Sequence, residues 1–198
     1  SYAAWILVNN LKIHNDPIKK DLVNKIVNYI ISQQNEDGSW FYFDKDQRDN
    51  TDNFIDNFHT CFVLENLFLI WKWNKDERLK KSIEKGFKFF KKSFINNDFS
   101  VRYYYYYPNP TGIKVDIRSC AETIFCCALL SEIFPESLEL STKIAEWTIN
   151  NMLDSDGYYY FRIYRTHKHR MPYMRWGQAP MFNALTYLSL KLKERNNG

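Results

Sequence analysis

The stretch Asp37-Gly-Ser-Trp-Phe-Tyr-Phe43 decides the fold, because its pattern of a turn followed by aromatic residues returns twice along the chain. The second copy is Asn97-Asp-Phe-Ser-Val-Arg-Tyr-Tyr104, and the third is Asp156-Gly-Tyr-Tyr-Tyr-Phe161. The copies start about sixty residues apart, a spacing typical of proteins built from internal structural repeats. Each copy predicts a turn and a short extended segment or hairpin rather than a helix.

Two kinds of helix alternate around these segments. A helix with one apolar face is expected before each turn, and Asp16-Pro17, Asp76 and Pro135 supply the capping residues and prolines that favour its start. These helices are expected over residues 18–34, 77–95 and 138–153. A more uniformly apolar helix is expected after each aromatic segment, and a further one opens the chain, over residues 2–15, 55–73, 115–134 and 174–193.

This alternation predicts an all-α fold. A helix that is apolar all round has to be buried, whereas an amphipathic helix can face solvent on one side, so the two kinds form an inner and an outer layer. We therefore expect an α/α toroid with about seven helices and with the aromatic segments gathered at one rim. Seven helices are about half of a ring of six pairs. Residues 1–198 are thus expected to be one domain, the C-terminal part of a longer toroid, whose open end pairs with another copy or with the missing half.

Composition argues against several classes of protein. The 198 residues carry 27 basic and 23 acidic side chains, and the resulting net charge of +4 does not indicate a nucleic-acid partner. No apolar stretch approaches the ~20 residues needed to span a bilayer, and residues 1–15 lack the pattern of a signal peptide. We therefore expect a cytoplasmic protein without a membrane span.

The four cysteines fall inside apolar helical patterns. They are Cys61, Cys120, Cys126 and Cys127, and they show neither zinc-site spacing nor the pattern of a disulfide framework. Reduced thiols in the core are the expected outcome, and neither a metal nor a cofactor is expected.

One motif resembles a known group of toroids. Gln34-Asn-Glu-Asp-Gly-Ser-Trp40 is similar to the Q-x₂₋₅-G-x-W repeat of terpenoid cyclases and protein prenyltransferases. The catalytic elements of those families are not visible, since the chain has no D-x-D-D acid motif and no prenyltransferase zinc pattern.

A closer likeness, over most of the chain, is to prokaryotic toroid proteins labelled polysaccharide-biosynthesis proteins of the VpsJ type. Their D-G-S-W, I-D-x-F-H-T, I-D-I-H-S, D-G-Y-F-Y and R-x-P-Y-M-R-W-x-Q motifs resemble residues 37–40, 55–60, 115–119, 156–160 and 170–178. Arg118 departs from the pattern, because the family has a histidine there. Similar toroids include glycoside hydrolases, polysaccharide lyases and sugar epimerases, so the resemblance implies a carbohydrate-linked role.

Asp56 and His59 are the first candidates for catalysis. An imidazole one turn after an aspartate, at the rim end of an inner helix, can act as a general acid or base near neutral pH. Asp116 occupies the equivalent position in the next repeat. Two structural alternatives stay open, namely helix capping by both aspartates and a structural hydrogen bond for His59.

The tyrosine run at residues 103–107 supplies a candidate for a second proton-transfer group. Because successive side chains of an extended segment alternate faces, either Tyr105 with its odd-numbered neighbours or the pair Tyr104 and Tyr106 faces the cleft. Tyr105 is chosen as the candidate.

The stretch Arg170-Met-Pro-Tyr-Met-Arg-Trp-Gly-Gln178 has the composition of a site for sugar acids. Arginine binds carboxylates in bidentate fashion, and aromatic side chains offer flat faces on which sugar rings can rest. Packing of the last helix against its neighbour is the alternative. The substrate-binding candidates at this rim are Tyr42, Arg118, Arg170, Tyr173, Arg175, Trp176 and Gln178.

Three functions fit these residues. The first is an enzyme that acts on an acidic oligosaccharide or polysaccharide, either by proton abstraction, as in lyases and epimerases, or by hydrolysis with Asp56 and Asp116 as the carboxyl pair. The second is a toroid that binds glycans or serves as a scaffold without chemistry. The third is a terpenoid-processing toroid, which would need a largely apolar cleft.

Overall fold

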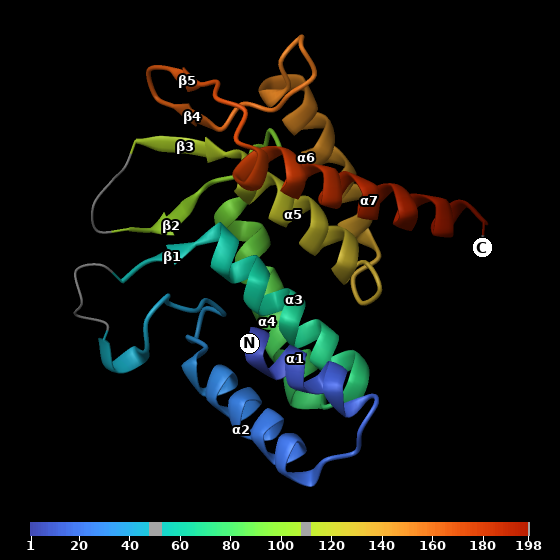
Figure 1. The fold of residues 1–198 in the computed structure, drawn as a ribbon. Coiled ribbons are helices and arrows are strands. Elements are labelled where there is room, and N and C mark those ends of the chain that lie inside the picture. The colour runs from blue at the N-terminus through green and yellow to red at the C-terminus, as the bar shows by residue number, and fades with distance from the viewer. Residues whose placement is uncertain (48–52, 108–111, 198) are drawn as a thin grey trace.

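The structure, a computed structural model, describes residues 1–47, 53–107 and 112–197. Seven α-helices lie within these ranges (Figure 1), as the sequence predicts. They are α1 (Tyr2–Leu11), α2 (Pro17–Gln33), α3 (Asn57–Asn74), α4 (Glu77–Phe94), α5 (Ile117–Leu130), α6 (Glu136–Met152) and α7 (Ala179–Asn197). A short 3₁₀ turn covers Lys45–Gln47, and a π-helical turn, Met174–Gln178, leads into α7.

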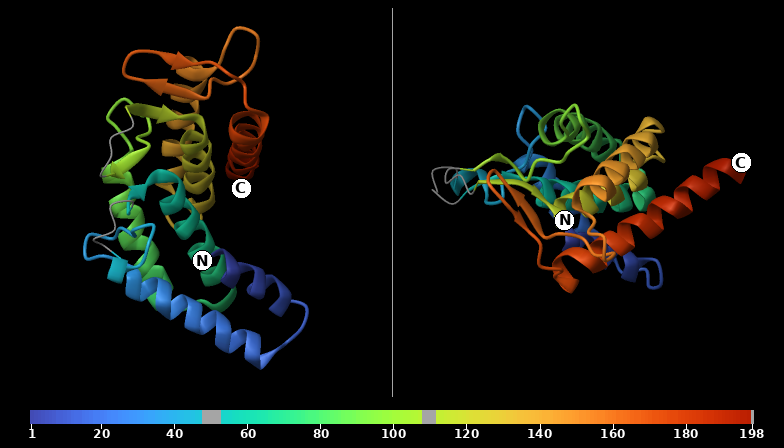
Figure 2. Two further views of the ribbon diagram at one scale, coloured as in Figure 1. Left: turned by 60° about the vertical axis from the view of Figure 1, so that its left-hand side comes forward. Right: turned by 90° about the horizontal axis from the view of Figure 1, so that it is seen from above.

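The helices form the two layers that the alternation predicts. The apolar helices α1, α3, α5 and α7 contact one another in series, and α2, α4 and α6 each pack on the inner helix that precedes them. Figure 2 shows the curved course of the chain from the α1–α2 pair at one end to α6 and α7 at the other. The fold is therefore all-α with an inner and an outer layer.

Short strands gather where the inner helices begin. β1 (Ile55–Asp56) pairs antiparallel with β2 (Tyr104–Tyr106) and leads into α3. β3 (Ile113–Asp116) leads into α5 and pairs with β4 (Arg162–Tyr164), which pairs with β5 (Lys168–His169). Figure 1 shows all five strands on one side of the molecule. The aromatic segments thus collect at one rim, as predicted.

The first copy of the repeated turn shows why its residues recur. The Asp37 carboxylate accepts hydrogen bonds from the backbone N–H of Ser39 at 2.9 Å and from its hydroxyl at 2.7 Å. Gly38 has a φ of +100°, and a Cβ there would lie 2.4 Å from the carbonyl oxygen of Lys85. Only glycine combines a positive φ with the absence of a Cβ, so Gly38 allows the turn to pack directly against the backbone of α4.

Trp40 completes the turn motif by joining two outer helices. Its indole N–H donates to the carbonyl oxygen of Ile30 in α2 at 3.1 Å. Its ring lies so close to Gly86 in α4 that a Cβ there would be 2.6 Å away. The Trp40 side chain is buried and packs in the core.

The cysteines belong to the core. Cys61, Cys120, Cys126 and Cys127 are free and buried, and burial raises the pKa of the Cys61 and Cys120 thiols to about 12. No helix among the described residues is long and apolar enough to cross a membrane.

Candidate functional site

Asp56 and His59 form a hydrogen-bonded pair at the start of α3. Asp56 is the N-cap of the helix, and its Oδ1 accepts a hydrogen bond from the backbone N–H of His59 at 2.9 Å. The same carboxylate holds Nδ1 of the imidazole, which lies 2.9 Å from both Oδ1 and Oδ2. The Asp56 side chain is 3% exposed and the His59 side chain 40% exposed. The carboxylate therefore caps the helix and orients a partly exposed imidazole ring.

Aromatic rings surround this imidazole. Tyr42 contacts His59 edge to face at 4.7 Å between ring centroids, and Tyr42 also stacks on Phe54 at 4.7 Å. Phe58, the residue before the histidine, contacts the ring at 5.1 Å. Tyr42 is half exposed, so the structure places a partly solvent-accessible aromatic ring beside His59.

The aspartate of the next repeat has a different partner. Asp116 caps α5 by accepting a hydrogen bond from the backbone N–H of Arg118 at 2.9 Å. Its Oδ2 accepts a hydrogen bond from Nε of Arg162 in β4 at 2.5 Å. Asp116 is buried, so its carboxylate is neutralised by an arginine instead of orienting an imidazole.

Arg118 links the two repeats. Its guanidinium carbon lies 4.0 Å from the centroid of the Phe58 ring and 5.1 Å from that of Trp176. Within the described part of the chain it forms no salt bridge. Together with Asp116, Phe161, Arg162 and Trp176 it lines a hollow of about 210 Å³. The Arg118 guanidinium, which has no salt-bridge partner among the described residues, thus lies between two aromatic rings next to a cavity.

The tyrosine run splits between two faces. Tyr104 packs against Phe54 at 5.7 Å, on the His59 side. Tyr105 contacts Phe89 of α4 at 5.0 Å instead, so the structure does not bring it to the imidazole. Tyr103 is buried, and burial together with the nearby Asp116 carboxylate raises the pKa of its phenol.

The stretch from residue 170 to residue 178 is only partly in the hollow. Trp176 is 42% exposed, and its ring contacts two guanidinium groups. One is that of Arg118, and the other is that of Arg175, whose guanidinium carbon lies 5.0 Å from the ring centroid. Arg170 lies over the Tyr160 ring at 5.2 Å. Tyr173 is edge to face with Phe161, 4.7 Å away. Trp176 thus lines the hollow, while Arg175 contacts Trp176 and Tyr173 contacts Phe161, another lining residue. Arg170 lies over the third aromatic segment.

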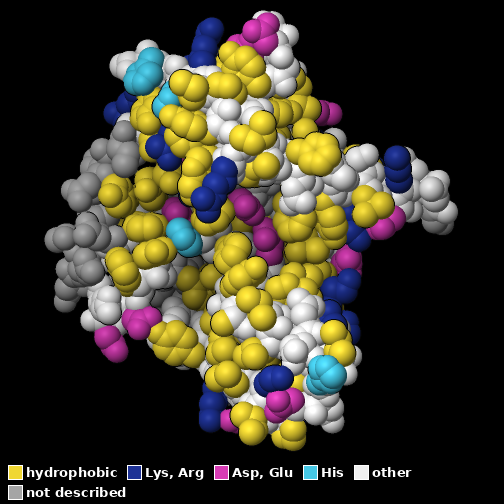
Figure 3. Space-filling model, viewed as in Figure 1, with side chains coloured by type: hydrophobic (Ala, Val, Ile, Leu, Met, Phe, Trp, Pro, Cys, Tyr) yellow, Lys and Arg dark blue, Asp and Glu magenta, His cyan; other side chains and the backbone are white. Residues whose placement is uncertain are grey.

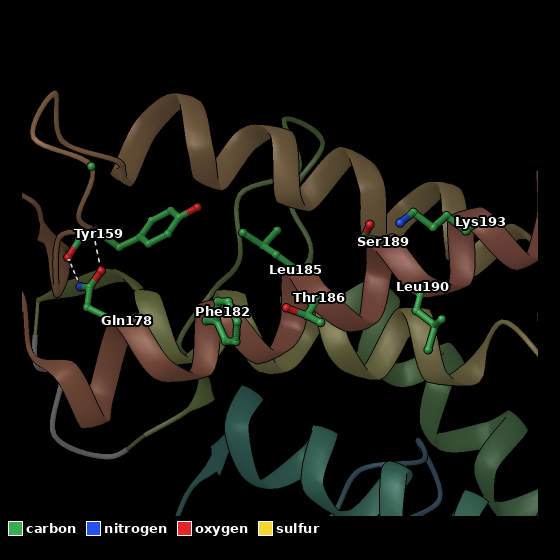
Figure 4. A pocket seen from close by; sticks show the side chains of 9 residues that line it. Tyr159, Gln178, Phe182, Leu185, Thr186, Ser189, Leu190 and Lys193 are labelled. Atoms are coloured by element: carbon green, nitrogen blue, oxygen red, sulfur yellow. Dashed lines mark hydrogen bonds between the residues drawn. The ribbon is translucent and has the colours of Figure 1, made fainter.

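Gln178 has a structural role. Its side-chain carbonyl accepts from the backbone N–H of Tyr159 at 2.9 Å, and its amide donates to the Tyr159 carbonyl at 2.8 Å (Figure 4). The Gln178 amide therefore pairs with the backbone of Tyr159 as a neighbouring strand would.

A groove of about 680 Å³ runs along α7. Gln178 and Tyr159 line it, together with Phe182, Leu185 and Leu190. The predicted pairing surface with a copy or a missing half stays a prediction.

Two glutamates lie further along the inner helices. Glu65 of α3 is 7% exposed, and its Oε1 has no hydrogen-bond partner among the described residues. Glu122 of α5 is close enough for its charge to act on Glu65, and burial raises the pKa of both carboxyls. Figure 3 shows acidic side chains between two apolar areas near the centre of this face, with histidine and basic side chains nearby.

Sequence reasoning did not single out Glu65, Glu122 or Arg162. A usable signal existed for one of them, since Glu122 follows Arg118 by four residues and therefore shares its helix face. Glu65 is a single acidic residue in an otherwise apolar helix. From the sequence alone, such a residue indicates only a position on the helix that faces solvent. Arg162 becomes visible only once β4 is paired with β3.

Comparison with known proteins shows the fold. No family model matches the chain, and no curated protein sequence matches it either. Among solved structures, cellobiose 2-epimerase from Bacillus thermoamylovorans superposes with a TM-score of 0.68 at 16% identity, over 96% of this chain and 51% of that one. A GH76 alpha-mannanase from Bacteroides thetaiotaomicron gives a TM-score of 0.68 at 14% identity, over 96% of this chain and 58% of that one.

A third structure is an inactive variant of the alpha-1,6-mannanase GH76A of Salegentibacter sp. HEL1_6 in complex with alpha-1,6-mannotriose. It has a TM-score of 0.67 at 14% identity, over 94% of this chain and 53% of that one. The chain has the α/α-toroid fold of these carbohydrate-active enzymes and spans about half of their length. The resemblance to VpsJ-type proteins stays a prediction.

Proposed function

We propose that the chain binds an acidic oligosaccharide or polysaccharide at the rim and removes the proton next to the sugar carboxylate, as lyases and epimerases do. The observation that carries the proposal is the pair of His59 and buried Asp56, in which Nδ1 lies 2.9 Å from the carboxylate and the His59 side chain is 40% exposed. A buried carboxylate against one ring nitrogen fixes the tautomer and leaves the other nitrogen as the base.

The chemistry of this pair suits proton abstraction. With Nδ1 donating to Asp56, Nε2 of His59 carries a lone pair toward the cleft. The imidazolium that forms on proton uptake is stabilised by the buried carboxylate at 2.9 Å. The pair is therefore arranged as a general base with an orienting group.

Arg118 supports an acidic ligand. Its guanidinium forms no salt bridge in the described structure and lies beside the hollow. A sugar carboxylate there would gain charge-assisted hydrogen bonds, and the guanidinium would stabilise negative charge as the neighbouring proton leaves. The partly exposed rings of Tyr42 and Trp176 are suited to contact with sugar rings.

Hydrolysis by the two rim aspartates receives less support. Asp56 is engaged by the imidazole and by the helix start, and Asp116 by Arg162 and its own helix start. Hydrolysis by two carboxyl groups needs one as a proton donor and the other free to act on water or on the sugar. The polar rim likewise disfavours a terpenoid substrate. Glycan binding without chemistry is the second candidate, favoured by the half-exposed Tyr42 and Trp176.

The experiment uses the protein at its full natural length and oligosaccharides of galacturonic acid, with neutral mannotetraose as a control ligand. In D₂O, NMR follows hydrogen exchange at the carbon next to the carboxylate, and calorimetry measures binding. We expect exchange and binding with the acidic oligosaccharides, loss of exchange in His59→Gln, and loss of binding in Arg118→Met. The matched controls His14→Gln and Arg195→Met change exposed residues far along the sequence and should leave both unchanged. Binding without exchange would favour the non-catalytic function, and no binding would reject both.

We propose a cytoplasmic location on separate grounds. The four free, buried thiols support a reducing compartment such as the cytoplasm. A role in polysaccharide biosynthesis rests on the motif resemblance.

A further inference from the structure

A second hollow lies between the two groups of strands. Its volume is about 480 Å³, and it is lined on one side by Tyr103 and Tyr104, where β2 begins, and on the other by residues 113–115 of β3. β2 and β3 belong to separate sheets, so within the described structure no ladder of hydrogen bonds closes the space between them. The hollow extends to the outer layer of helices, where Trp147 of α6 lines it.

The ribbon of β3 and β4 separates this second hollow from the one at the rim. Successive side chains of a strand point to opposite faces. Arg162 of β4 lines the rim hollow, whereas its neighbour Ile163 lines the second hollow. Tyr103 also lines the second hollow, and the guanidinium carbon of Arg162 lies 5.5 Å from the centroid of its ring. The two hollows are therefore neighbours, with Tyr103 and Arg162 between them.

Two cations without an ionic partner line the second hollow. Nε of Arg102 donates to the side-chain oxygen of Asn96 at 2.8 Å, and no hydrogen bond within the described structure uses its other two guanidinium nitrogens. Lys114 of β3 is exposed, as is Arg102. The salt bridges of the described residues use neither of them. An anionic group in the hollow would thus meet an arginine and a lysine whose charges are available.

The carboxylate that lines the second hollow, that of Asp98, belongs to the repeated turn. It accepts hydrogen bonds from the backbone N–H of Ser100 at 3.1 Å and from its hydroxyl at 2.6 Å. The Ser100 hydroxyl in turn accepts a hydrogen bond from the side-chain amide of Asn96 at 2.8 Å. Residues 35–39 form the same three bonds, at 2.9, 2.7 and 2.9 Å. Asp98 therefore holds the turn, as its counterpart does in the first copy.

The first copy of the turn borders a hollow of its own, with a different charge. This hollow has a volume of about 590 Å³, and the described residues that line it include two acidic residues and no lysine or arginine. Arg102 takes the place that Phe41 has in the first copy. Lys114 likewise takes the place of Phe54, two residues before the aspartate that caps the inner helix. The same turn thus borders both hollows, and the cations are particular to the second one.

We propose that the second hollow binds a further acidic sugar residue of the polysaccharide whose reacting residue occupies the rim. This inference rests on the proposed function and adds a binding site to it. Arg102 and Lys114 bind the carboxylate of that residue, and the partly exposed ring of Trp147 contacts the sugar ring. A short oligosaccharide occupies the rim alone. A longer one reaches both hollows and gains the second contact without a second loss of translational freedom.

Calorimetry with galacturonate oligosaccharides of three and six residues tests the proposal. In the wild-type protein the hexamer should bind roughly 10- to 100-fold more tightly than the trimer, the gain expected from one more charge-assisted contact. The double variant Arg102→Met, Lys114→Met should lose most of this gain while it keeps the affinity for the trimer and the hydrogen-exchange rate at the rim. The matched double variant Lys20→Met, Arg195→Met removes the same charges from exposed positions on α2 and α7 and should keep the gain.

A local signal shows where the longer chain binds. In ¹⁵N-labelled protein the indole N–H of Trp147, which lines the second hollow, gives an NMR signal that the Trp147→Phe spectrum assigns. The hexamer should shift this signal in the wild-type protein and leave it unchanged in the Arg102→Met, Lys114→Met variant. The trimer should leave it nearly unchanged in both proteins.

The results separate this inference from the proposed function. The second site is refuted if the trimer and the hexamer bind alike in the wild-type protein, if the gain persists in Arg102→Met, Lys114→Met, or if the Trp147 signal does not respond. Hydrogen exchange at the rim would then continue. A gain that depends on Arg102 and Lys114 without any exchange supports the second site and rejects the rim chemistry. Absence of binding by both oligosaccharides overturns the two together.

Discussion

Replacing Asp56 by asparagine isolates the electrostatic role of this residue from its structural one. Asparagine caps helices about as well as aspartate, so in the Asp56→Asn variant the oxygen that accepts from the His59 N–H at 2.9 Å can stay in place. The amide NH₂ then faces Nδ1, which has to accept a hydrogen bond. The imidazole proton therefore moves to Nε2, and the base is blocked.

The expected magnitudes follow from these contacts. Stability should change by less than ~0.5 kcal/mol, because the cap survives, whereas Asp56→Ala should lose about 1 kcal/mol. In a serine protease triad the equivalent change lowers kcat by about 10⁴ through the wrong tautomer. We expect a loss of about 10³ to 10⁴ in hydrogen exchange at the sugar carbon, or ~4 to 5.5 kcal/mol in the barrier.

The assay combines two readings of the same variant. ¹⁵N NMR of labelled histidines reports the tautomer, with His59 assigned from the His59→Gln spectrum, and thermal unfolding reports stability. The reasoning is refuted if Asp56→Asn keeps Nδ1 protonated and retains exchange at the wild-type rate. A large loss of stability in this variant would show that the cap, and not the tautomer, explains any loss of activity.

Three further changes test other parts of the structure. Glu65→Leu should raise the free energy of unfolding by about 1–3 kcal/mol at neutral pH, because it removes an unsatisfied buried carboxyl. Since burial raises the folded-state pKa of Glu65, its proton stabilises the fold at low pH and this contribution is lost as pH rises through that pKa, so denaturation of Glu65→Leu should depend less on pH. Gly86→Ala should cost about 1–3 kcal/mol in denaturant unfolding, because the new Cβ would meet Trp40 at 2.6 Å. Gln178→Leu should lower the unfolding temperature by breaking two hydrogen bonds to Tyr159 while calorimetry shows unchanged sugar binding.

Much of the fold was readable from the sequence because its signals are local. The turn at Asp37 and Gly38 depends on hydrogen bonds within three residues and on one positive φ. The alternation of apolar and amphipathic helices likewise depends on each helix alone, and it predicted both layers. The helix starts at Asp56 and Asp116 were also correctly placed, although two strands occupy the expected first turns.

The parts that escaped prediction depend on register between elements. The pairing of β1 with β2 is irregular at Ile55 and Asp56, so the faces of the tyrosine run could not be assigned from alternation alone. The partner of Gln178 is nineteen residues away in sequence. The charge of Glu122 acts on Glu65 only because α3 and α5 pack against each other, which neither helix alone predicts.

The most direct test of the central claim is a crystal structure of the His59→Gln variant, at full natural length, with a galacturonate tetrasaccharide. We predict that a sugar carboxylate binds the Arg118 guanidinium and that the carbon next to it lies within about 3.5 Å of the residue-59 side chain, the distance of a reacting pair. Sugar rings should rest on Tyr42 or Trp176. A tetrasaccharide bound only in the groove along α7, or no bound sugar at concentrations well above the dissociation constant, would contradict the assignment of the rim as the site.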